Sequence, residues 1–485
     1  MKDSKELAGA TIVAPTTEAA DLAPAHNSAL SALRPGTHSA LKNALIIGTL
    51  AIGAKIFAAV REVVIAWQYG ISGIVDAFNI SYTVVTWAPQ LITSIMVTAL
   101  VPHLVSLGRR AEWAIVKNEL NGFVLLIGCA TLLLTWTLGP FIAAEIAEGL
   151  QPLTIQAARE MAFILAPFSF LMICSGYFAV RLQARQRFGY TFLEALPPIV
   201  LSILVLGVGH AASFWPLVYG ILLGGAVQFL LLVRLVRKHD QGVGRARIGF
   251  ASPLWRSMFL AVGFIALGQT LNALSIPIDQ ILAADLGTGA VATLGYSNRL
   301  LGLITGLAIT VIGYSLLPIF STTVNDGQMG AGRTFALTAA GLLFLGGGVL
   351  SALVWSLARL GVSYVFERGA FTATDTEIVS SVFRIAALQL PFFVSGLALM
   401  QWIAAKRRYG QICLVLLFMA AAKLLSALVL SRFYGLEGLA WSQVIMYAIF
   451  ALGMIVFATA SEEELSPQEA NSRDASGELI SPGLK

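Results

Sequence analysis

The sequence predicts an all-α polytopic membrane protein with about twelve transmembrane helices, arranged as two pseudo-symmetric six-helix lobes around a central cleft. Three observations predict this fold. The chain is unusually apolar, apolar segments long enough to cross a bilayer recur along it, and the loops between these segments alternate in positive charge.

The composition identifies lipid as the solvent for most of the chain. Hydrophobic residues make up 57% of the 485 residues, charged residues make up 12%, and the mean hydropathy is +0.80. A soluble domain carries about 25% charged residues, so this chain lacks the polar groups that a water-exposed surface needs. We attribute the net charge of +5 to cytoplasmic loops and not to nucleic-acid binding.

Apolar segments of about 20 residues recur along the chain. The first six are centred near residues 55, 90, 130, 171, 200 and 224, and the second six near 270, 305, 345, 391, 420 and 447. The loops after the even-numbered segments carry 15 Lys and Arg residues, and the loops after the odd-numbered segments carry 4. The positive-inside rule therefore predicts that the even loops and both termini are cytoplasmic.

Short motifs indicate an internal duplication. ARQRFG (184–189) follows the fourth segment and AKRRYG (405–410) follows the tenth, and LVPHL (100–104) parallels LLPIF (316–320) at nearly the same offset. Because six spans return the chain to the starting side, both copies have one orientation, which is typical of parallel repeats that flank a central cleft. Alternating access of that cleft is the mechanism that such an arrangement favours.

The predicted organisation follows from these segments. It comprises a disordered cytoplasmic tail over 1–42, an N-terminal lobe over 43–238, a cytoplasmic linker over 239–252, a C-terminal lobe over 253–460 and a cytoplasmic tail over 461–485.

Ionisable residues inside the first two segments are candidates for function, because a charge in the bilayer is costly. Lys55 lies at the middle of the first segment, where its amine is far from both surfaces. Glu62 follows seven residues later and shares a helical face with Lys55. Arg61 lies nearer the outer end, and Asp76, at the start of the second segment, is a candidate partner for it.

The second half carries matching charges. Asp279 lies within the seventh segment, and Arg299 lies about eight residues, or about 12 Å, into the eighth. Two interpretations are open: the charges pair and hold helices together, or they form a cationic patch in a water-filled cleft. Arginine suits phosphate recognition, so the second interpretation predicts an anionic substrate.

The sequence lacks the motifs of nucleotide and catalytic chemistry. GxxxxGK[ST], HExxH, CxxC and GxSxG are absent, so we expect no cofactor, no enzymatic activity and no ATP drive from this chain. Transport would then depend on a gradient, the membrane potential or downstream consumption. Cys129, Cys174 and Cys413 have no metal or disulfide spacing, and we expect them to be small buried side chains.

Three stretches of the chain resemble a known family. AVREVVIAWQYGISGIVDAFNISY (59–82), GYSNRLLGLITGLAITVIGYSLLPIFS (295–321) and VFERGAFTATDT (365–376) are similar to motifs of the lipid II flippase family (MurJ/MviN), in the superfamily of multidrug exporters and polysaccharide flippases. The resemblance covers roughly residues 43–460. It implies a bacterial inner-membrane protein that flips polyprenyl-diphosphate-linked saccharides through a cationic cleft.

The resemblance also suggests roles for the buried charges. Lys55, Arg61 and Arg299 would bind the diphosphate. Glu62, Asp76 and Asp279 would balance those charges or bind a coupling cation. The remaining partners are membrane lipids and proteins of glycan assembly.

Two departures from the family leave the saccharide open. The run WAPQLITSIMVTALVP (87–102) carries no charge where the family has arginines and an acid, and Gly302 stands where an acid is typical. An exopolysaccharide or other surface-glycan intermediate therefore fits at least as well as lipid II. Two other classes are alternatives: a cation-coupled multidrug exporter, which would favour acids and aromatic residues in its cleft, and a non-transporting scaffold of a glycan assembly complex.

Overall fold

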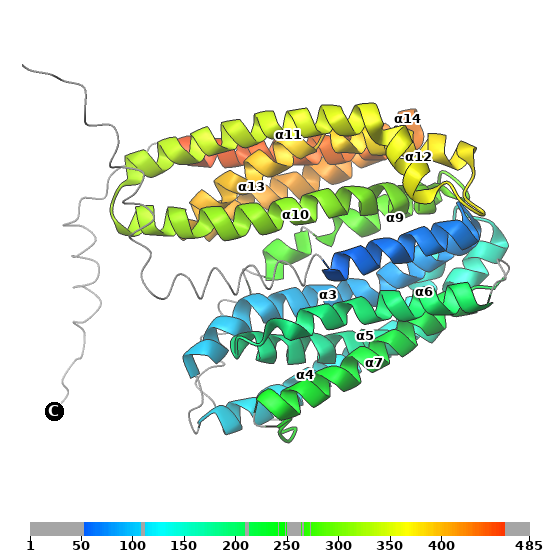
Figure 1. Ribbon diagram of the computed structural model, residues 1–485, viewed down its shortest axis with the longest axis horizontal. Helices are drawn as coiled ribbons and strands as arrows, with labels where there is room; N and C mark the ends of the chain where they lie inside the picture. The colour runs from blue at the N-terminus through cyan, green and yellow to red at the C-terminus, as the bar shows by residue number, and fades with distance from the viewer. Residues whose placement is uncertain are drawn as a thin grey trace, which may run out of the picture. The chain divides into compact units, whose positions relative to one another are not determined.

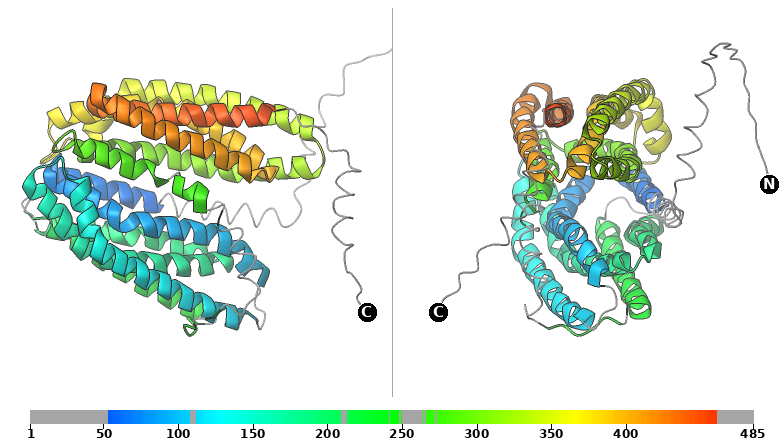
Figure 2. Two further views of the ribbon diagram at one scale, coloured as in Figure 1. Left: turned by 180° about the vertical axis from the view of Figure 1, so that it is seen from behind. Right: turned by 90° about the vertical axis from the view of Figure 1, so that its left-hand side faces the viewer.

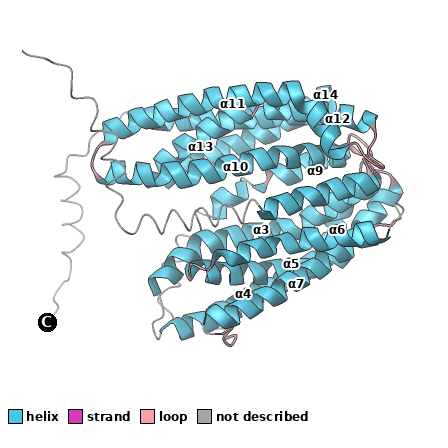
Figure 3. Ribbon diagram, viewed as in Figure 1, coloured by secondary structure: helices cyan, strands magenta, loops and turns pink. Residues whose placement is uncertain are grey.

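The computed structural model shows an all-helical protein. Every regular element in the described part of the chain is a helix, and most connecting loops are short (Figure 3). The expectations for the tails at 1–42 and 461–485 lie outside that part. The described residues are 53–107, 112–208, 213–240, 242–247, 249, 263, 266–271 and 273–460.

The helices group into two bundles within residues 53–460 (Figures 1 and 2). The N-lobe comprises a helix over residues 53–69, α3 (Gly73–Leu107), α4 (Glu112–Ile146), α5 (Pro152–Ala184), the 3-10 helix η1 (Phe188–Ala195), α6 (Leu196–Val208) and α7 (Trp215–His239). The C-lobe comprises helical residues 266–271, α9 (Ser275–Ala284), α10 (Ala290–Asn325), α11 (Met329–Phe366), α12 (Ala373–Ala387), α13 (Leu390–Ala405) and α14 (Tyr409–Thr459). This grouping confirms the predicted two-lobed helical fold.

Nine segments among the described residues are long and apolar enough to cross a membrane. The count of about twelve stays a prediction. One of the nine, α14, contains two helices, because Gly435 interrupts it with non-helical angles (φ 56, ψ −130). The two arms run antiparallel, since Lys423 Nζ donates to Ser442 Oγ at 2.8 Å. They correspond to the segments predicted near residues 420 and 447.

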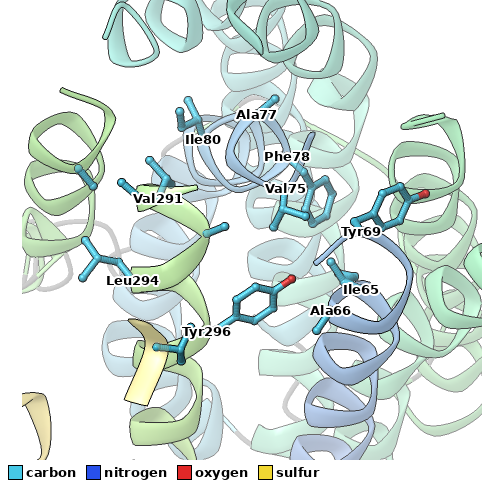
Figure 4. Packing of buried hydrophobic residues seen from close by; sticks show 14 of the residues in the cluster. Ile65, Ala66, Tyr69, Val75, Ala77, Phe78, Ile80, Val291, Leu294 and Tyr296 are labelled. Carbon is cyan, nitrogen blue, oxygen red and sulfur yellow. The ribbon is translucent and has the colours of Figure 1, made fainter. Parts of the chain in front are cut away.

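Among the described residues, the hydrophobic core that the two lobes share lies at one end. That core combines N-lobe residues such as Val75 and Phe78 with C-lobe residues such as Val291 and Tyr296 (Figure 4). We call this the joined end; it carries the loops at 70–72, 285–289 and 367–372.

Towards the opposite end, the separate end, each lobe has a core of its own. Trp113 and Tyr177 belong to the N-lobe core, and Phe320 and Trp402 belong to the C-lobe core. Most apolar burial that holds the lobes together therefore lies at the joined end.

The internal duplication is visible in the helix ends. Gln186 after α5 and Arg407 after α13 both adopt the left-handed conformation, with φ of 55° and 59°. The next residues close the same Schellman turn, since Arg187 N donates to Leu182 O at 3.0 Å and Arg408 N donates to Ile403 O at 3.2 Å. The two turns lie in the matching motifs at 184–189 and 405–410, so the two lobes share local geometry as well as helix order.

A buried arginine fastens the segment after α7 to the N-lobe. The loop-charge count assigns Arg181 to a cytoplasmic loop, but its side chain is fully buried in α5. Its Nε donates to Asp240 Oδ2 at 2.7 Å, and its two terminal nitrogens donate to the carbonyl oxygens of Gly242 and Val243 at 2.8 and 3.0 Å. Asn121 on α4 donates to Val243 O as well, at 2.7 Å.

The cysteines differ from expectation. Cys174 is buried, as predicted, but Cys129 is exposed and Cys413 is half-buried. A small apolar side chain in a membrane helix can face lipid at little cost, so an apolar sequence context does not by itself predict burial.

Replacing Gln186 by glycine is expected to stabilise the protein. A side chain at φ 55° carries a steric penalty of about 1 kcal/mol that glycine lacks. We expect Gln186→Gly to raise the thermal unfolding temperature of purified protein, and Ala179→Gly, inside α5, to lower it because glycine disfavours helix. A lower unfolding temperature for Gln186→Gly than for wild type would contradict the role of this turn.

Candidate substrate site between the two lobes

Asp76 links the two lobes at the joined end. Its carboxylate, on α3, accepts hydrogen bonds from the backbone N–H groups of Gly289 and Ala292 at the start of α10, the latter at 2.7 Å. An anion at a helix N-terminus satisfies otherwise unpaired donors and is favoured by the helix dipole. The candidate Arg61–Asp76 pair is wrong: Asp76 caps a helix of the other lobe, and Arg61 pairs elsewhere.

Further backbone hydrogen bonds join the two lobes at the joined end; together with the Asp76 contacts we call them the seal. Ala370 N donates to Trp67 O at 2.8 Å, and Tyr296 OH donates to Gly70 O at 3.0 Å. Gly70 adopts φ 57°, and a Cβ there would lie 2.4 Å from Ala370 O, so only glycine permits this approach. The three stretches that resemble the flippase motifs thus meet at one end of the molecule.

A polar cavity lies between the lobes beside this seal. We call it the polar chamber; its volume is about 290 Å³. Its lining comes from residue 61, α3, α9 and α10, which belong to both lobes. The lining residues are Arg61, Asn79, Tyr82, Thr83, Thr86, Trp87, Gln90, Ile276, Asp279, Gln280, Val291, Leu294, Gly295, Asn298 and Arg299.

Glu62 lies between two arginines of opposite lobes. Its two carboxylate oxygens pair with Arg61 of the N-lobe and Arg299 of the C-lobe. Arg299 also donates to Asn79 Oδ1 at 2.9 Å, and the Arg61 guanidinium lies 5.7 Å from the centre of the Tyr82 ring. The side chain of Glu62 is 4% exposed, whereas Arg61 is 12% and Arg299 is 27% exposed. The cluster therefore carries two cations against one anion, and its cations are the groups that reach the cavity.

Lys55 lies further along the same cleft. A Cβ built on Gly306 of α10 would lie 3.0 Å from Lys55 Nζ, so the amine rests against α10. The Glu62–Arg299 ion pair joins the same two helices, seven residues further along each of them. At the rise of an α-helix, Lys55 therefore lies about 10 Å from the arginine cluster, towards the separate end. Three cations thus follow the line where the helix over residues 53–69 meets α10.

Asp279 forms a salt bridge with a lysine of its own lobe. Lys423 Nζ lies 2.6 Å from Asp279 Oδ1, and Gln443 Nε2 donates to Asp279 Oδ2 at 3.0 Å. Lys423 is 1% exposed, so both charges are withdrawn from solvent and depend on each other. Gln443 also donates to Asn298 Oδ1 at 3.2 Å, which connects the pair to the polar chamber.

The structure brings five of the six predicted site residues to the joined end or the polar chamber and places Lys55 beside them. Sequence reasoning missed the uncharged polar partners and Lys423. A signal for the former exists in α3, where Asn79, Thr83, Thr86 and Gln90 recur at helical spacing in an otherwise apolar span. Lys423 is a charge inside the predicted segment near residue 420, but its pairing with Asp279 carries no signal because the partner lies in a distant helix.

The arrangement of this site can hold an anion between the lobes. Two guanidinium groups already share one carboxylate, and arginine forms paired hydrogen bonds with phosphate oxygens as readily. Since these cations come from both lobes, the ligand itself would bridge the two lobes.

Solved structures share this architecture. The structure superposes on that of the lipid II flippase MurJ in its inward closed conformation with a TM-score of 0.73 at 19% identity, covering 86% of this chain and 88% of that chain. An inward-facing multidrug transporter of the MATE family gives a TM-score of 0.65 at 15% identity, covering 85% and 93%. The fold is thus that of a two-lobed helical membrane transporter.

Sequence comparison identifies the family. The model for "Lipid II flippase MurJ" matches residues 65–470, and the chain belongs to this family. A probable lipid II flippase MurJ of Rhizobium tropici is 26% identical over 385 residues, which cover 73% of this chain and 69% of that protein. One of Helicobacter pylori strain J99 is 26% identical over 361 residues, covering 66% and 76%.

Removal of the Asp76 carboxylate is expected to loosen the joined end. Loss of a helix cap costs about 1 kcal/mol, enough to shift a two-state equilibrium about fivefold. We expect Asp76→Ala to increase the labelling of an Ile71→Cys variant by a membrane-impermeant maleimide about fivefold, read at position 71 by mass spectrometry. Asp375→Ala is the matched control, because Asp375 caps α12 within one lobe. Equal labelling in both backgrounds would exclude a closing role for Asp76.

The Asp279–Lys423 pair is expected to behave as one unit. Asp279→Asn or Lys423→Met leaves a buried charge unpaired, at a cost of about 3–5 kcal/mol, and the double variant should cost far less than the sum. Thermal unfolding of the purified variants measures this coupling. The exposed pair Arg359–Glu377, with side chains 63% and 58% exposed, is the control, and its removal should cost no more than about 1 kcal/mol. Additive effects at 279 and 423 would argue against a paired state.

Proposed function

We propose that this protein flips a polyprenyl-diphosphate-linked saccharide across the bacterial cytoplasmic membrane by alternating access. Its membership of the lipid II flippase family and its two-lobed fold support this reading over the drug exporter and the scaffold. The names of its relatives specify lipid II, and the charge-free run at 87–102 keeps another surface-glycan intermediate as the second candidate cargo.

The observation that carries the proposal is the carboxylate that Arg61 and Arg299 share. Glu62 pairs with both guanidinium groups and holds them towards the polar chamber. The diphosphate, with more negative charge than one carboxylate, would displace Glu62 and draw Lys55 in. Glu62 would then act as the internal substitute for the substrate anion, which keeps the arginines paired throughout the cycle.

Orientation follows from the loop charges. The loops of the joined end are the odd-numbered loops, which carry few Lys and Arg, so we place this end on the outer face and both termini in the cytoplasm. The saccharide would then reach the polar chamber from the cytoplasmic side. Release outside requires the Asp76 contacts to α10 to break and the separate end to close.

The charge pairs bear on how the cycle is driven. Because the ammonium group of Lys423 already neutralises Asp279, we assign Asp279 a charge-balancing role and leave no acid in the C-lobe part of the polar chamber for a coupling cation. The substrate's own negative charge would then respond to the membrane potential, at about 2.3 kcal/mol per charge per 100 mV. Membrane lipids surround the protein, and proteins of glycan assembly would supply and consume the substrate.

Complementation tests the proposal. We expect the wild-type chain to restore growth to a bacterial strain depleted of its lipid II flippase. Arg299→Ala should abolish rescue at equal membrane abundance, because losing a charge-assisted contact of about 1.5–3 kcal/mol weakens diphosphate binding about 10- to 100-fold. Arg359→Ala, which changes an exposed side chain of α11 outside the polar chamber, should rescue as well as wild type.

Two other results would change the reading. Failure of the wild-type chain to rescue, with the protein present in the membrane, would reject lipid II as cargo and direct attention to surface polysaccharide in a deletion strain. Rescue by Arg299→Ala would reject the arginine cluster as the diphosphate site.

A further inference from the structure

A second cavity lies in the C-lobe between the polar chamber and the separate end. Its volume is about 970 Å³, and we call it the apolar chamber. α10, α13 and α14 supply most of its lining, with side chains such as Ile309, Leu397, Met400, Leu416 and Phe450. Its size and apolar lining are those of a cavity built for a ligand of small-molecule dimensions.

The two chambers follow one another along the same helices. On α10, Arg299 lines the polar chamber, Gly306 contacts Lys55, and Ile309 lines the apolar chamber. Steps of seven and three residues keep these positions on one face of the helix. α3 repeats the pattern, since Gln90 lines the first chamber and Thr98 lines the second. A ligand could therefore occupy both chambers at once, with its polar part towards the joined end.

The chemistry of the lining selects one kind of occupant. A saccharide needs many hydrogen-bond partners, and the described lining offers few beyond Thr98, Gln269 and Tyr409. An apolar cation would meet Arg407 at the cytoplasmic mouth and Lys55 at the other end, which carry the same sign of charge. An apolar chain attached to an anion has neither problem, because its chain fits the lining and its anion fits the cations.

We propose that the apolar chamber binds the isoprene units next to the diphosphate, while Lys55, Arg61 and Arg299 hold the diphosphate itself. This inference rests on the proposed function and adds to it a recognition site for the lipid part of the cargo. A chamber of this size takes only the first units of a long polyprenyl chain, so the remainder lies in the bilayer. The protein would thereby recognise the diphosphate and the isoprene units next to it, which every cargo of this class shares.

Cys413 provides a native probe, because it lines the apolar chamber and is half-buried. A variant with Cys129→Ser and Cys174→Ser leaves it as the only thiol. The full chain in phosphatidylcholine nanodiscs is treated with a maleimide, and alkylation is followed by mass spectrometry. One sample receives a long-chain polyprenyl-diphosphate saccharide, another the same headgroup on a single isoprene unit, each at about ten times its Kd. We expect the long-chain lipid to slow alkylation about tenfold, and the short analogue to leave it unchanged.

A substitution tests the same site without chemistry at the cysteine. Ile309 is 51% exposed, so Ile309→Trp can fill the chamber without disturbing a buried core. We expect it to raise the Kd of the long-chain lipid about tenfold and to leave that of the short analogue unchanged. Leu345→Trp, on the exposed face of α11, is the control and should change neither.

Three results would overturn the inference. Equal protection of Cys413 by both ligands would mean that closure of the cleft, and not the isoprene chain, shields the thiol. Binding of the long-chain lipid without protection would place its chain elsewhere. If wild-type protein binds neither ligand in a direct binding measurement, the proposed function fails, and this inference fails with it.

Discussion

Glu62 lies between two guanidinium groups that belong to different lobes, and the rest of the site depends on this contact. Inside a membrane protein an unpaired charge is expensive, so Arg61 and Arg299 can stay near the cleft only while an anion accompanies them. One carboxylate serves both, and it leaves one positive charge in excess. The contact therefore links the two lobes, and under the proposed function it also keeps both arginines in place for the diphosphate.

The same logic separates the other acids of the site into distinct roles. Asp76 accepts hydrogen bonds from two backbone N–H groups of α10 in the other lobe, so its charge closes the joined end. Asp279 has Lys423, within one lobe, and this pair stabilises the C-lobe whichever way the lobes face. Glu62 pairs with cations of both lobes, so its contacts, like those of Asp76, would change if the lobes moved apart.

Sequence reasoning reached the helices, the lobes and the deep charges because each leaves a local pattern. Apolar runs of span length identify helices in lipid, and a lysine in the middle of such a run is conspicuous, as at Lys55. The repeated basic motif predicted an internal duplication, and the structure shows equivalent turns in its two copies, at Gln186 and Arg407.

Pairing between distant helices could not be predicted in the same way. The backbone N–H groups that bind Asp76 carry no side-chain signal, and the pairing of Asp279 with Lys423 depends on how two helices are rotated against each other. Arg181 was misplaced for a related reason, since a basic residue near a helix end can face the surface or the interior, and Asp240 decides which.

The uneven placement of the cores has a consequence for how this protein could evolve. With one core shared at the joined end and two at the other, the proposed switch between inward-open and outward-open states would exchange apolar contact at one end for apolar contact at the other. The populations of the two states then depend on a small difference between two large burial terms. One methylene group, about 0.8 kcal/mol, changes their ratio about fourfold. Natural selection could thus adjust the balance between the two states through side chains of the shared core, such as Val75, that do not line the polar chamber.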